Sequence, residues 1–308
     1  MKKELLELYA LPFESLLEEA RKVHEKHHNA NEVTLFSALN VKAGGCPEDC
    51  AFCPQSAHYA TGVTRTNLID VKEAVAFAYK MKSLGCLKLC LGAAWRAVPK
   101  GDLFEEILEL VRSVSATGVK PCLSMGMLDI WQAEALRDSG AYEYNLNLDT
   151  SRRYYSNIIK TRTYDERYES MRNIQRGGLR LSSGGIIGMG ETIEDRIDLL
   201  DELGRLDEPP ATVILNLLLQ IEGTPLAKAP EIPEEEFIRM AALARIRMPK
   251  ADLALSAGRK KLSKVGQSLC FRAGVNGIYT GPKILTVPNP TVEEDKVMLS
   301  ELGIRIAV

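Results

Sequence analysis

The sequence predicts a single-domain α/β fold, a (β/α)8 TIM-type barrel with an N-terminal helical segment, because short apolar runs alternate with helical patterns. Eight runs have the length and composition of buried strands: residues 34–41, 86–91, 119–124, 142–148, 179–187, 212–219, 253–256 and 275–279. Helical patterns lie between them, at residues 71–84, 103–116, 131–139, 167–175, 193–206, 234–247 and 259–271. A doubly wound sheet shares this alternation and is the structural alternative.

Residues at the helix boundaries support this division. Thr192 stands three residues before Asp195 at a helix start, and glycines follow four predicted helix ends, at positions 85, 118, 140 and 177. An amphipathic stretch at 15–28 opens the chain, so we expect residues 1–30 to form the N-terminal helical segment and residues 31–308 the barrel. We expect three histidines near the end of that stretch to be solvated, since positive charge suits a helix C-terminus: His24, His27 and His28.

Composition and charge exclude several classes of partner. The 308 residues are 45% hydrophobic and 26% charged, which suits a large buried core. The 39 basic and 41 acidic residues nearly balance, so the formal charge of -2 gives no general attraction to nucleic acid or to a membrane surface. No apolar run approaches the roughly 20 residues of a membrane helix, and the start of the sequence lacks the apolar segment of a signal peptide. We therefore expect a cytoplasmic protein.

Three of the seven cysteines crowd into one short loop. Cys46, Cys50 and Cys53 follow the first predicted strand, at the barrel end where active sites lie. Three thiolates on a bend rich in glycine and proline can hold three irons of a [4Fe-4S] cluster and leave the fourth iron without a protein ligand. The alternative is a structural zinc site, for which His58 is the nearest fourth ligand. Thiolates of this kind need a reducing compartment.

The C-x3-C-x2-C spacing resembles the signature of the radical S-adenosylmethionine superfamily, and the surrounding residues resemble the biotin synthase family. The matching blocks are CAFCPQSAHY (50–59), CLGAAW (90–95), YNLNLDTS (144–151), SGGIIGMGET (183–192), GTPL (223–226) and LSAGR (255–259). In the superfamily the open iron binds S-adenosyl-L-methionine, and one electron then releases a 5′-deoxyadenosyl radical. The resemblance implies sulfur insertion into dethiobiotin, with the sulfur drawn from an auxiliary iron–sulfur cluster.

Three polar residues alternate along the fourth predicted strand. Asn145, Asn147 and Asp149 are spaced by two and therefore share one face, which we expect to point into the barrel. By resemblance, Asn147 and Asp149 contact the cofactor, with the carboxylate on the ribose hydroxyls. Asn145 matches a residue that contacts the ureido ring of the substrate. The alternative is that these side chains tie down turns at the strand end.

Further residues match family positions. Arg167, expected to open the following helix, matches an arginine that pairs with the cofactor carboxylate, and a surface salt bridge is its ordinary alternative. Phe52 and Tyr59 match the aromatic residues beside the adenine, and Ala93 and Ala94 match the backbone segment that receives the cofactor's amino group. Asn216 and Thr286 match the residues that hold the ureido group and the carboxylate of dethiobiotin.

The resemblance breaks at the auxiliary cluster, which in the family is commonly a two-iron cluster held by three cysteines and one arginine. Cys90 and Cys122 match two of the cysteines and should point into the barrel, but Ser182 and Ala254 replace the other two ligands. We expect a larger cluster, with four irons and an extra sulfide, anchored by the two cysteines and a further ligand. The alternative is a different radical enzyme, a mutase or methyltransferase-like relative, that has lost this cluster. Cys86 should face the same way as Cys90 and serve as core packing.

Four residues near the expected substrate differ from those that are usual in the family: Lys88, Glu143, Leu146 and Val287. Cys270 lies in an apolar helix and is expected to be a buried structural thiol. By resemblance, the protein is a homodimer that takes electrons from a flavodoxin- or ferredoxin-type donor. The same resemblance implies sulfur and iron–sulfur assembly proteins as partners.

Overall fold

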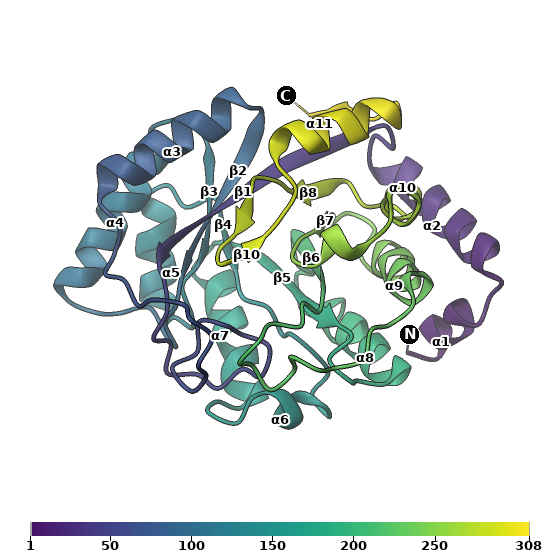
Figure 1. Cartoon of the computed structure of the whole chain (residues 1–308), viewed down its shortest axis with the longest axis horizontal. Coiled ribbons are helices and arrows are strands. Elements are labelled where there is room, and N and C mark those ends of the chain that lie inside the picture. The colour runs from purple at the N-terminus through teal and green to yellow at the C-terminus, as the bar shows by residue number, and fades with distance from the viewer. Residues whose placement is uncertain (1, 308) are drawn as a thin grey trace.

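Eight parallel strands close into a barrel (Figure 1). The structure, a computed structural model, describes residues 2–307. Its barrel strands are β1 Glu32–Lys42, β2 Cys86–Ala93, β3 Lys120–Ser124, β4 Glu143–Asn145, β5 Arg180–Ile187, β6 Thr212–Leu217, β7 Asp252–Leu255 and β8 Gly277–Tyr279. Each strand pairs with the next, and β8 pairs back onto β1, where Phe36 lies opposite Tyr279. This closure confirms the predicted barrel and excludes the open doubly wound sheet.

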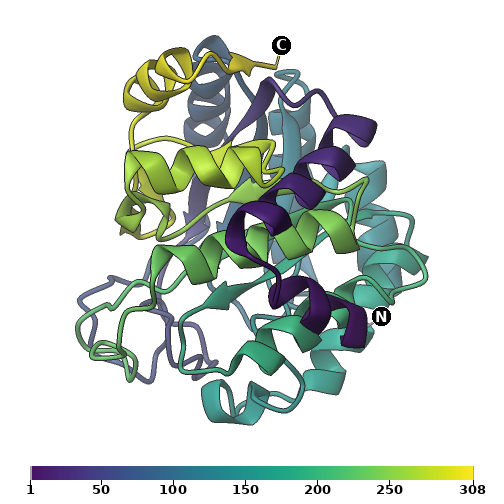
Figure 2. The same ribbon diagram turned by 90° about the vertical axis from the view of Figure 1, so that its right-hand side faces the viewer.

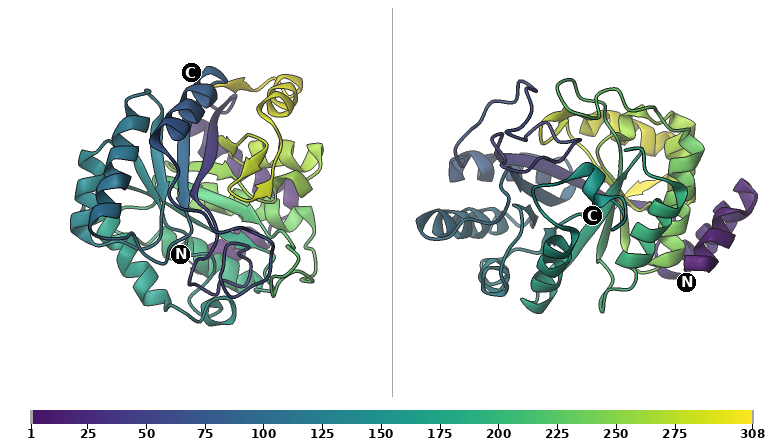
Figure 3. Two further views of the ribbon diagram at one scale, coloured as in Figure 1. Left: turned by 60° about the vertical axis from the view of Figure 1, so that its left-hand side comes forward. Right: turned by 90° about the horizontal axis from the view of Figure 1, so that it is seen from below.

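The helices form a layer around the strands (Figure 3). Besides α2 (Phe13–His27) of the predicted N-terminal segment, the seven helices predicted between the strands are present: α3 Val71–Ser83, α4 Asp102–Ser115, α5 Ile130–Asp138, α7 Tyr164–Arg176, α8 Ile193–Leu203, α9 Glu234–Arg247 and α10 Lys264–Arg272. The elements that the pattern did not predict are short or terminal: α1 Lys2–Tyr9, α6 Tyr155–Ile158, β9 Lys283–Ile284, β10 Val287–Pro288, α11 Val292–Glu301 and β11 Arg305–Ile306. Across residues 2–307, every helix is too short or too polar to span a bilayer.

Capping residues fix where two of these helices begin. The hydroxyl of Thr192 accepts the Asp195 N–H at 3.2 Å, which is the cap that the sequence predicts for α8. Thr163 caps α7 in the same way, so the helix begins at Tyr164. The prediction that Arg167 opens this helix is therefore wrong by three residues. The predicted helix at 259–271 is also divided, into a 3₁₀ turn at Arg259–Lys261 and α10.

A bulge near the start of β2 decides where Cys86 points. Leu35 pairs with Cys86 and Phe36 pairs with Lys88, so one residue of β2 between them has no partner on β1. Cys86 therefore packs with Leu35 in the layer between strands and helices, whereas Cys90 packs inside the barrel with Phe36. The prediction that Cys86 and Cys90 face the same way is wrong because of this extra residue.

Charged side chains close the amino-terminal end of the barrel interior. Lys88 Nζ lies 3.3 Å from Glu143 Oε2, 3.2 Å from Asp252 Oδ2 and 3.1 Å from Thr212 Oγ1. Burial lowers the pKa of Lys88, but Glu143 and Asp252 raise it more, so the net direction is upward and the lysine stays charged. Two of the departures from the family pattern, Lys88 and Glu143, thus form one buried ion pair at the amino-terminal end of the barrel interior.

The N-terminal helices lie outside the barrel, where α2 (Phe13–His27) crosses α9 (Figure 2). His24 is 1% exposed, and its ring stacks on that of His28 at 5.3 Å between centroids. His28 is half-buried, with Nε2 2.7 Å from Arg245 Nη1 of α9. The prediction of solvated histidines is therefore wrong for His24 and His28, because α2 packs against α9. His27 is exposed as predicted.

Replacing His24 should make the protein less sensitive to acid. Burial, and then the charge of Arg245, lower the pKa of His24 to about 3. The unfolded chain binds a proton there below about pH 6.5, so stability falls as the pH drops from about 6.5 towards 3. The advantage of His24→Leu over the parent in free energy of unfolding should grow by about 2 kcal/mol between pH 8 and pH 5. Urea unfolding at both pH values measures this change, and a pH-independent difference would contradict it.

Candidate active site

A cavity of about 220 Å³ lies at the carboxyl ends of the barrel strands. The β9–β10 hairpin contributes Leu285 to its wall. The wall contains eight of the predicted site residues: Phe52, Cys53, Cys90, Asn145, Asn147, Asp149, Asn216 and Thr286. The other predicted site residues do not line it: Cys46, Cys50, Tyr59, Ala93, Ala94, Cys122 and Arg167.

Backbone hydrogen bonds shape the loop that carries the three closely spaced cysteines. The Cys46 N–H donates to Gln55 O at 2.9 Å, and the Cys53 N–H donates to Cys50 O at 2.9 Å. The chain leaves β1 through Gly44 and Gly45, at φ of +62° and +68°, a conformation that suits glycine. These bends place all three thiols on one compact segment beside the cavity.

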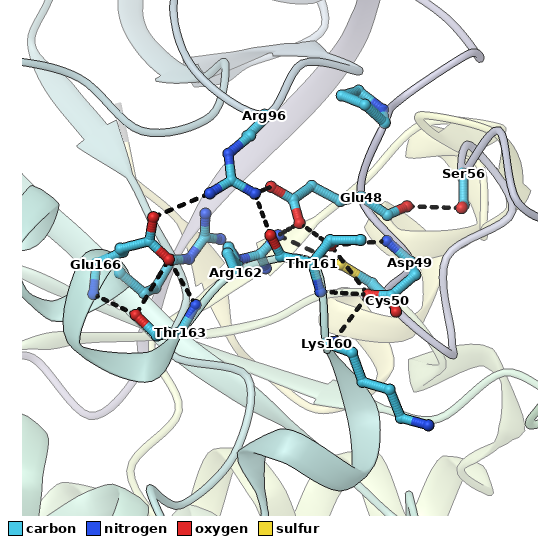
Figure 4. Close-up of polar contacts among 12 residues, drawn as sticks. Glu48, Asp49, Cys50, Ser56, Arg96, Lys160, Thr161, Arg162, Thr163 and Glu166 are labelled. Atoms are coloured by element: carbon cyan, nitrogen blue, oxygen red, sulfur yellow. Dashed lines mark hydrogen bonds and ion pairs between the residues drawn. The ribbon is translucent and has the colours of Figure 1, made fainter.

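Two acidic residues anchor this loop to the segment before α7 (Figure 4). Asp49 Oδ1 accepts the backbone N–H groups of residues 160 and 161, at 2.9 and 3.1 Å. Burial alone would raise the pKa of Asp49, but these donors lower it and keep the carboxylate charged. The buried Glu48 lies 2.9 Å from Arg96 Nη1 and 3.3 Å from Arg162 Nη1. The loop therefore depends on ionic anchors, since it has no regular secondary structure.

Arg162 is a site residue that the sequence analysis missed. Its side chain is 5% exposed and lies between Cys50 and Asp149. A single basic residue in a loop carries no periodic signal and looks like any surface arginine in a sequence. A polar residue in such a loop becomes informative only when the fold shows that it is buried.

Asn147 and Asp149 face the cavity as predicted, but not from a strand: β4 ends at Asn145, so the strand predicted at 142–148 is too long, and both residues lie in the segment that follows it. The Asp149 N–H donates to Gly184 O at 3.1 Å, and Asp149 has a φ of +69°, which is uncommon outside glycine. Burial raises the pKa of Asp149, while Arg167 and Arg162 oppose this shift. Asn147 Oδ1 is buried and has no hydrogen-bond partner in the described part of the chain. Such an oxygen costs about 1–3 kcal/mol unless a donor reaches it, which favours a bound ligand here.

Comparison with known proteins identifies the family. The radical SAM superfamily matches residues 40–203, and the biotin and thiamin synthesis associated domain matches residues 215–305. A biotin synthase of Sorangium cellulosum is 48% identical over 97% of this chain and 85% of its own length. One of Christiangramia forsetii is 44% identical over 98% of this chain and 84% of its own length. The chain belongs to the biotin synthase family.

Solved structures share the fold at low sequence identity. Methylornithine synthase superposes with a TM-score of 0.83 at 21% identity, over 100% of this chain and 94% of its own. A maturase of the [FeFe]-hydrogenase has a TM-score of 0.85 at 16% identity, over 100% of this chain and 72% of its own.

Within residues 2–307, no three His, Cys, Asp or Glu side chains converge on a point that could hold a single metal ion. Membership in the biotin synthase family implies S-adenosyl-L-methionine and iron–sulfur clusters as cofactors.

Two further cysteines lie inside the barrel of this biotin synthase family member. Cys90 and Cys122 are register partners on β2 and β3, and both pack inside the barrel as predicted. A hydrogen bond with Cys90, together with burial, raises the pKa of Cys122 well above its ordinary value. Ser182 does not join them but donates from Oγ to Asn145 Oδ1 at 3.3 Å. Ala254 is fully buried and has no donor atom in its side chain.

Another part of the wall is held rigid by its own hydrogen bonds. Asn216 Nδ2 donates to Gly185 O at 3.1 Å, and its Oδ1 accepts the Ala257 N–H at 3.1 Å. A carboxamide has two hydrogens on nitrogen and two lone pairs on oxygen, so each end retains one more hydrogen-bonding position. Asn216 can therefore donate to and accept from a ligand without losing its orientation.

Replacing Gly184 should separate β5 from β6 behind Asp149. A Cβ at Gly184 would lie 1.9 Å from Ile214 O, a backbone atom that no rotamer change can move. Overpacking costs about 1–3 kcal/mol, so Gly184→Ala should lose about 3 kcal/mol in urea unfolding. Ser183→Ala, the neighbouring control, removes the hydrogen bond to Leu146 O and should lose about 1 kcal/mol. Equal losses for the two variants would be inconsistent with this contact.

Proposed function

We propose that this member of the family is a biotin synthase that converts dethiobiotin into biotin with S-adenosyl-L-methionine and iron–sulfur clusters. The observation that carries the proposal is the placement of the three-cysteine loop at the cavity, where Cys53 forms part of the wall. The same wall contains Asn147, whose amide oxygen has no hydrogen-bond partner among residues 2–307. Similarity to biotin synthases over 97% of the chain supports this proposal.

The three thiols of the loop suit an iron–sulfur cluster. Burial raises the pKa of Cys50 to about 12 and that of Cys53 to about 11. Buried thiols of this kind stay protonated unless a cation binds the sulfur, and iron is the usual partner of cysteine thiolates in clusters. We infer that Cys46, Cys50 and Cys53 hold a [4Fe-4S] cluster and leave one iron for S-adenosyl-L-methionine.

The wall beside the loop suits this cofactor. Asn147 offers an acceptor, and the Asp149 carboxylate can accept hydrogen bonds from ribose hydroxyls. Arg167 Nε donates to Asn147 O at 2.8 Å, which places a guanidinium near the same wall for the cofactor's carboxylate. The ring of Phe52 lines the cavity and can pack against adenine. By resemblance, three residues outside the wall also contact the cofactor: Tyr59 lies beside the adenine, and the backbone of Ala93 and Ala94 receives the amino group.

Polar groups at other strand ends suit dethiobiotin. Asn145 and Asn216 have amides that both donate and accept, as the ureido ring requires, and the Thr286 hydroxyl can donate to the carboxylate. When bound, the cofactor and the clusters supply the 5′-deoxyadenosyl radical and the sulfur. The chain's own part is to hold the substrate at a fixed place and to exclude water with the apolar remainder of the wall, including Ile214 and Leu285.

The second site does not suit the two-iron cluster that is common in the family. Ser182 bonds to Asn145 and is a poor ligand for a soft metal, and Ala254 has no ligand atom. We propose a larger cluster, with four irons and an extra sulfide, anchored by Cys90 and Cys122 and one further ligand. Because the ligands usual at positions 182 and 254 are missing, there is a second candidate function: a mutase or methyltransferase-like radical enzyme without a sacrificial cluster.

The partners of the chain are proposed from the family. They are a flavodoxin- or ferredoxin-type electron donor, sulfur and iron–sulfur assembly proteins, and a second copy of the chain in a homodimer. A cytoplasmic location and a division into a helical segment at 1–30 and a barrel at 31–308 complete the proposal. The reducing conditions that free thiols need are consistent with that location.

Removing one thiol of the loop should abolish cofactor cleavage. Cys50→Ala leaves two ligands for the [4Fe-4S] cluster, so anaerobically reconstituted protein should lose about four irons per chain. It should no longer split S-adenosyl-L-methionine into methionine and 5′-deoxyadenosine after reduction. Cys270→Ala, which removes a buried thiol of α10, is the control and should keep both properties. Cleavage at the parent rate by Cys50→Ala would refute the proposed cluster site.

Iron counting should also separate the two candidate functions. With two four-iron clusters, the reconstituted parent should contain about eight irons per chain, and Cys122→Ala about four. Cys122→Ala should still cleave the cofactor but form no biotin. Cys86→Ala, whose thiol lies outside the barrel wall, should keep about eight irons. About four irons in the parent would instead favour a radical enzyme without the second cluster.

A further inference from the structure

Arg162 contacts the cysteine loop, the segment that follows β4 and the first residue of α6. Figure 4 shows its side chain beside Glu48 and Cys50. Its Nη1 lies 3.5 Å from Cys50 Sγ and 3.3 Å from Glu48 Oε2. Its Nη2 lies 3.6 Å from Asp149 Oδ2, and its Nε donates to Tyr155 OH at 2.9 Å. One buried guanidinium therefore contacts a thiol of the proposed cluster loop and a carboxylate of the proposed cofactor wall.

Neutralising Glu48 does not explain this arrangement. Arg96 Nη1 lies 2.9 Å from Glu48 Oε1, so that carboxylate has a second cationic partner. Among residues 2–307, the ion-pair partner of Asp149 is Arg162. Glu48 and Tyr155 instead hold the guanidinium in place, so that it faces Cys50 and Asp149.

We propose that Arg162 is a positioning residue with two effects, an inference that rests on the proposed function. It raises the reduction potential of the [4Fe-4S] cluster at the three-cysteine loop, and it holds Asp149 in place for S-adenosyl-L-methionine. Hydrogen bonds to cluster sulfurs and net charge are among the factors that set a cluster's potential. A cation 3.5 Å from Cys50 Sγ, in a buried site of low effective dielectric, favours the reduced and more negative cluster.

The two effects depend on different properties of the side chain. The potential depends on the positive charge, which lysine shares. The contact with Asp149 depends on the planar fork, because a single ammonium group cannot reach Cys50, Asp149 and Tyr155 together. Substitutions of Arg162 by glutamine and by lysine therefore separate charge from geometry.

The test compares Arg162→Gln and Arg162→Lys with the parent, each as the full chain reconstituted without oxygen. Redox titration followed by electron paramagnetic resonance gives the midpoint potential, and calorimetry gives the dissociation constant of S-adenosyl-L-methionine. In Arg162→Gln the ratio of reduced to oxidised cluster at a fixed donor potential should fall about tenfold, or about 59 mV for one electron. Its dissociation constant for the cofactor should rise about tenfold. Arg162→Lys should keep the potential but show the weaker cofactor binding.

Arg176→Gln is the matched control, because Arg176 is half-exposed on α7 and pairs with Glu169. It should match the parent in both measurements. An Arg162→Gln variant with the parent's potential and affinity would overturn the inference, and equal potentials in Arg162→Gln and Arg162→Lys would overturn its electrostatic part. A parent chain that holds no iron or does not cleave the cofactor would instead refute the proposed function.

Tyr155→Phe is a second test variant, for use if Arg162→Gln does not retain its cluster. This variant keeps the guanidinium charge and removes the hydroxyl that accepts from Nε at 2.9 Å. Its cofactor affinity should fall about threefold to tenfold while its potential stays at the parent value. Unchanged affinity in Tyr155→Phe would count against the positioning role, and a shifted potential would count against the separation of charge from geometry.

Discussion

The buried ion pairs of Arg162 connect the cysteine loop to the end of β4, and the geometry of the whole site depends on them. Cys50 and Arg162 are 112 residues apart in the sequence, and the loop has no helix or strand of its own to fix it. The closed barrel supplies a rigid base, because each strand end is held by two neighbours. Ionic anchors then set the loop above that base. Ion pairs and hydrogen bonds of side chains thus fix the irregular loop, and backbone hydrogen bonds between strands fix the barrel that carries it.

Local patterns in the sequence were enough to predict the scaffold. All eight strands and seven of the helices follow from apolar periodicity, and the cap at Thr192 follows from the spacing of two side chains. The predicted placement of Asn145, Asn147 and Asp149 on the cavity wall is also right, although β4 ends at Asn145 and the turn after it, not a strand period, positions the other two. These features were predictable because each is encoded within about ten neighbouring residues. The family resemblance then pointed to a function that periodicity alone could not supply.

The features that sequence reasoning missed are set by contacts between distant parts of the chain. Cys86 turned outward because one extra residue of β2 shifts the register with β1. His24 is buried because α2 meets α9, more than two hundred residues later in the sequence. Arg162 is buried because the loop above it supplies Glu48 and Cys50. In each case the neighbouring sequence gives no sign of these contacts, so only the tertiary fold reveals where the side chain lies.

The hydrogen bond from Ser182 to Asn145 joins the position where the family commonly has a cluster cysteine to a polar residue of the cavity wall. A thiol at position 182 would take away a good donor from a wall amide, and an arginine at position 254 would need space that Phe36 now fills beside Gly277. Each change therefore requires its own adjustment of the neighbouring side chains. A return to the ligand set that is common in the family would take both substitutions together with a rearrangement of this part of the barrel interior.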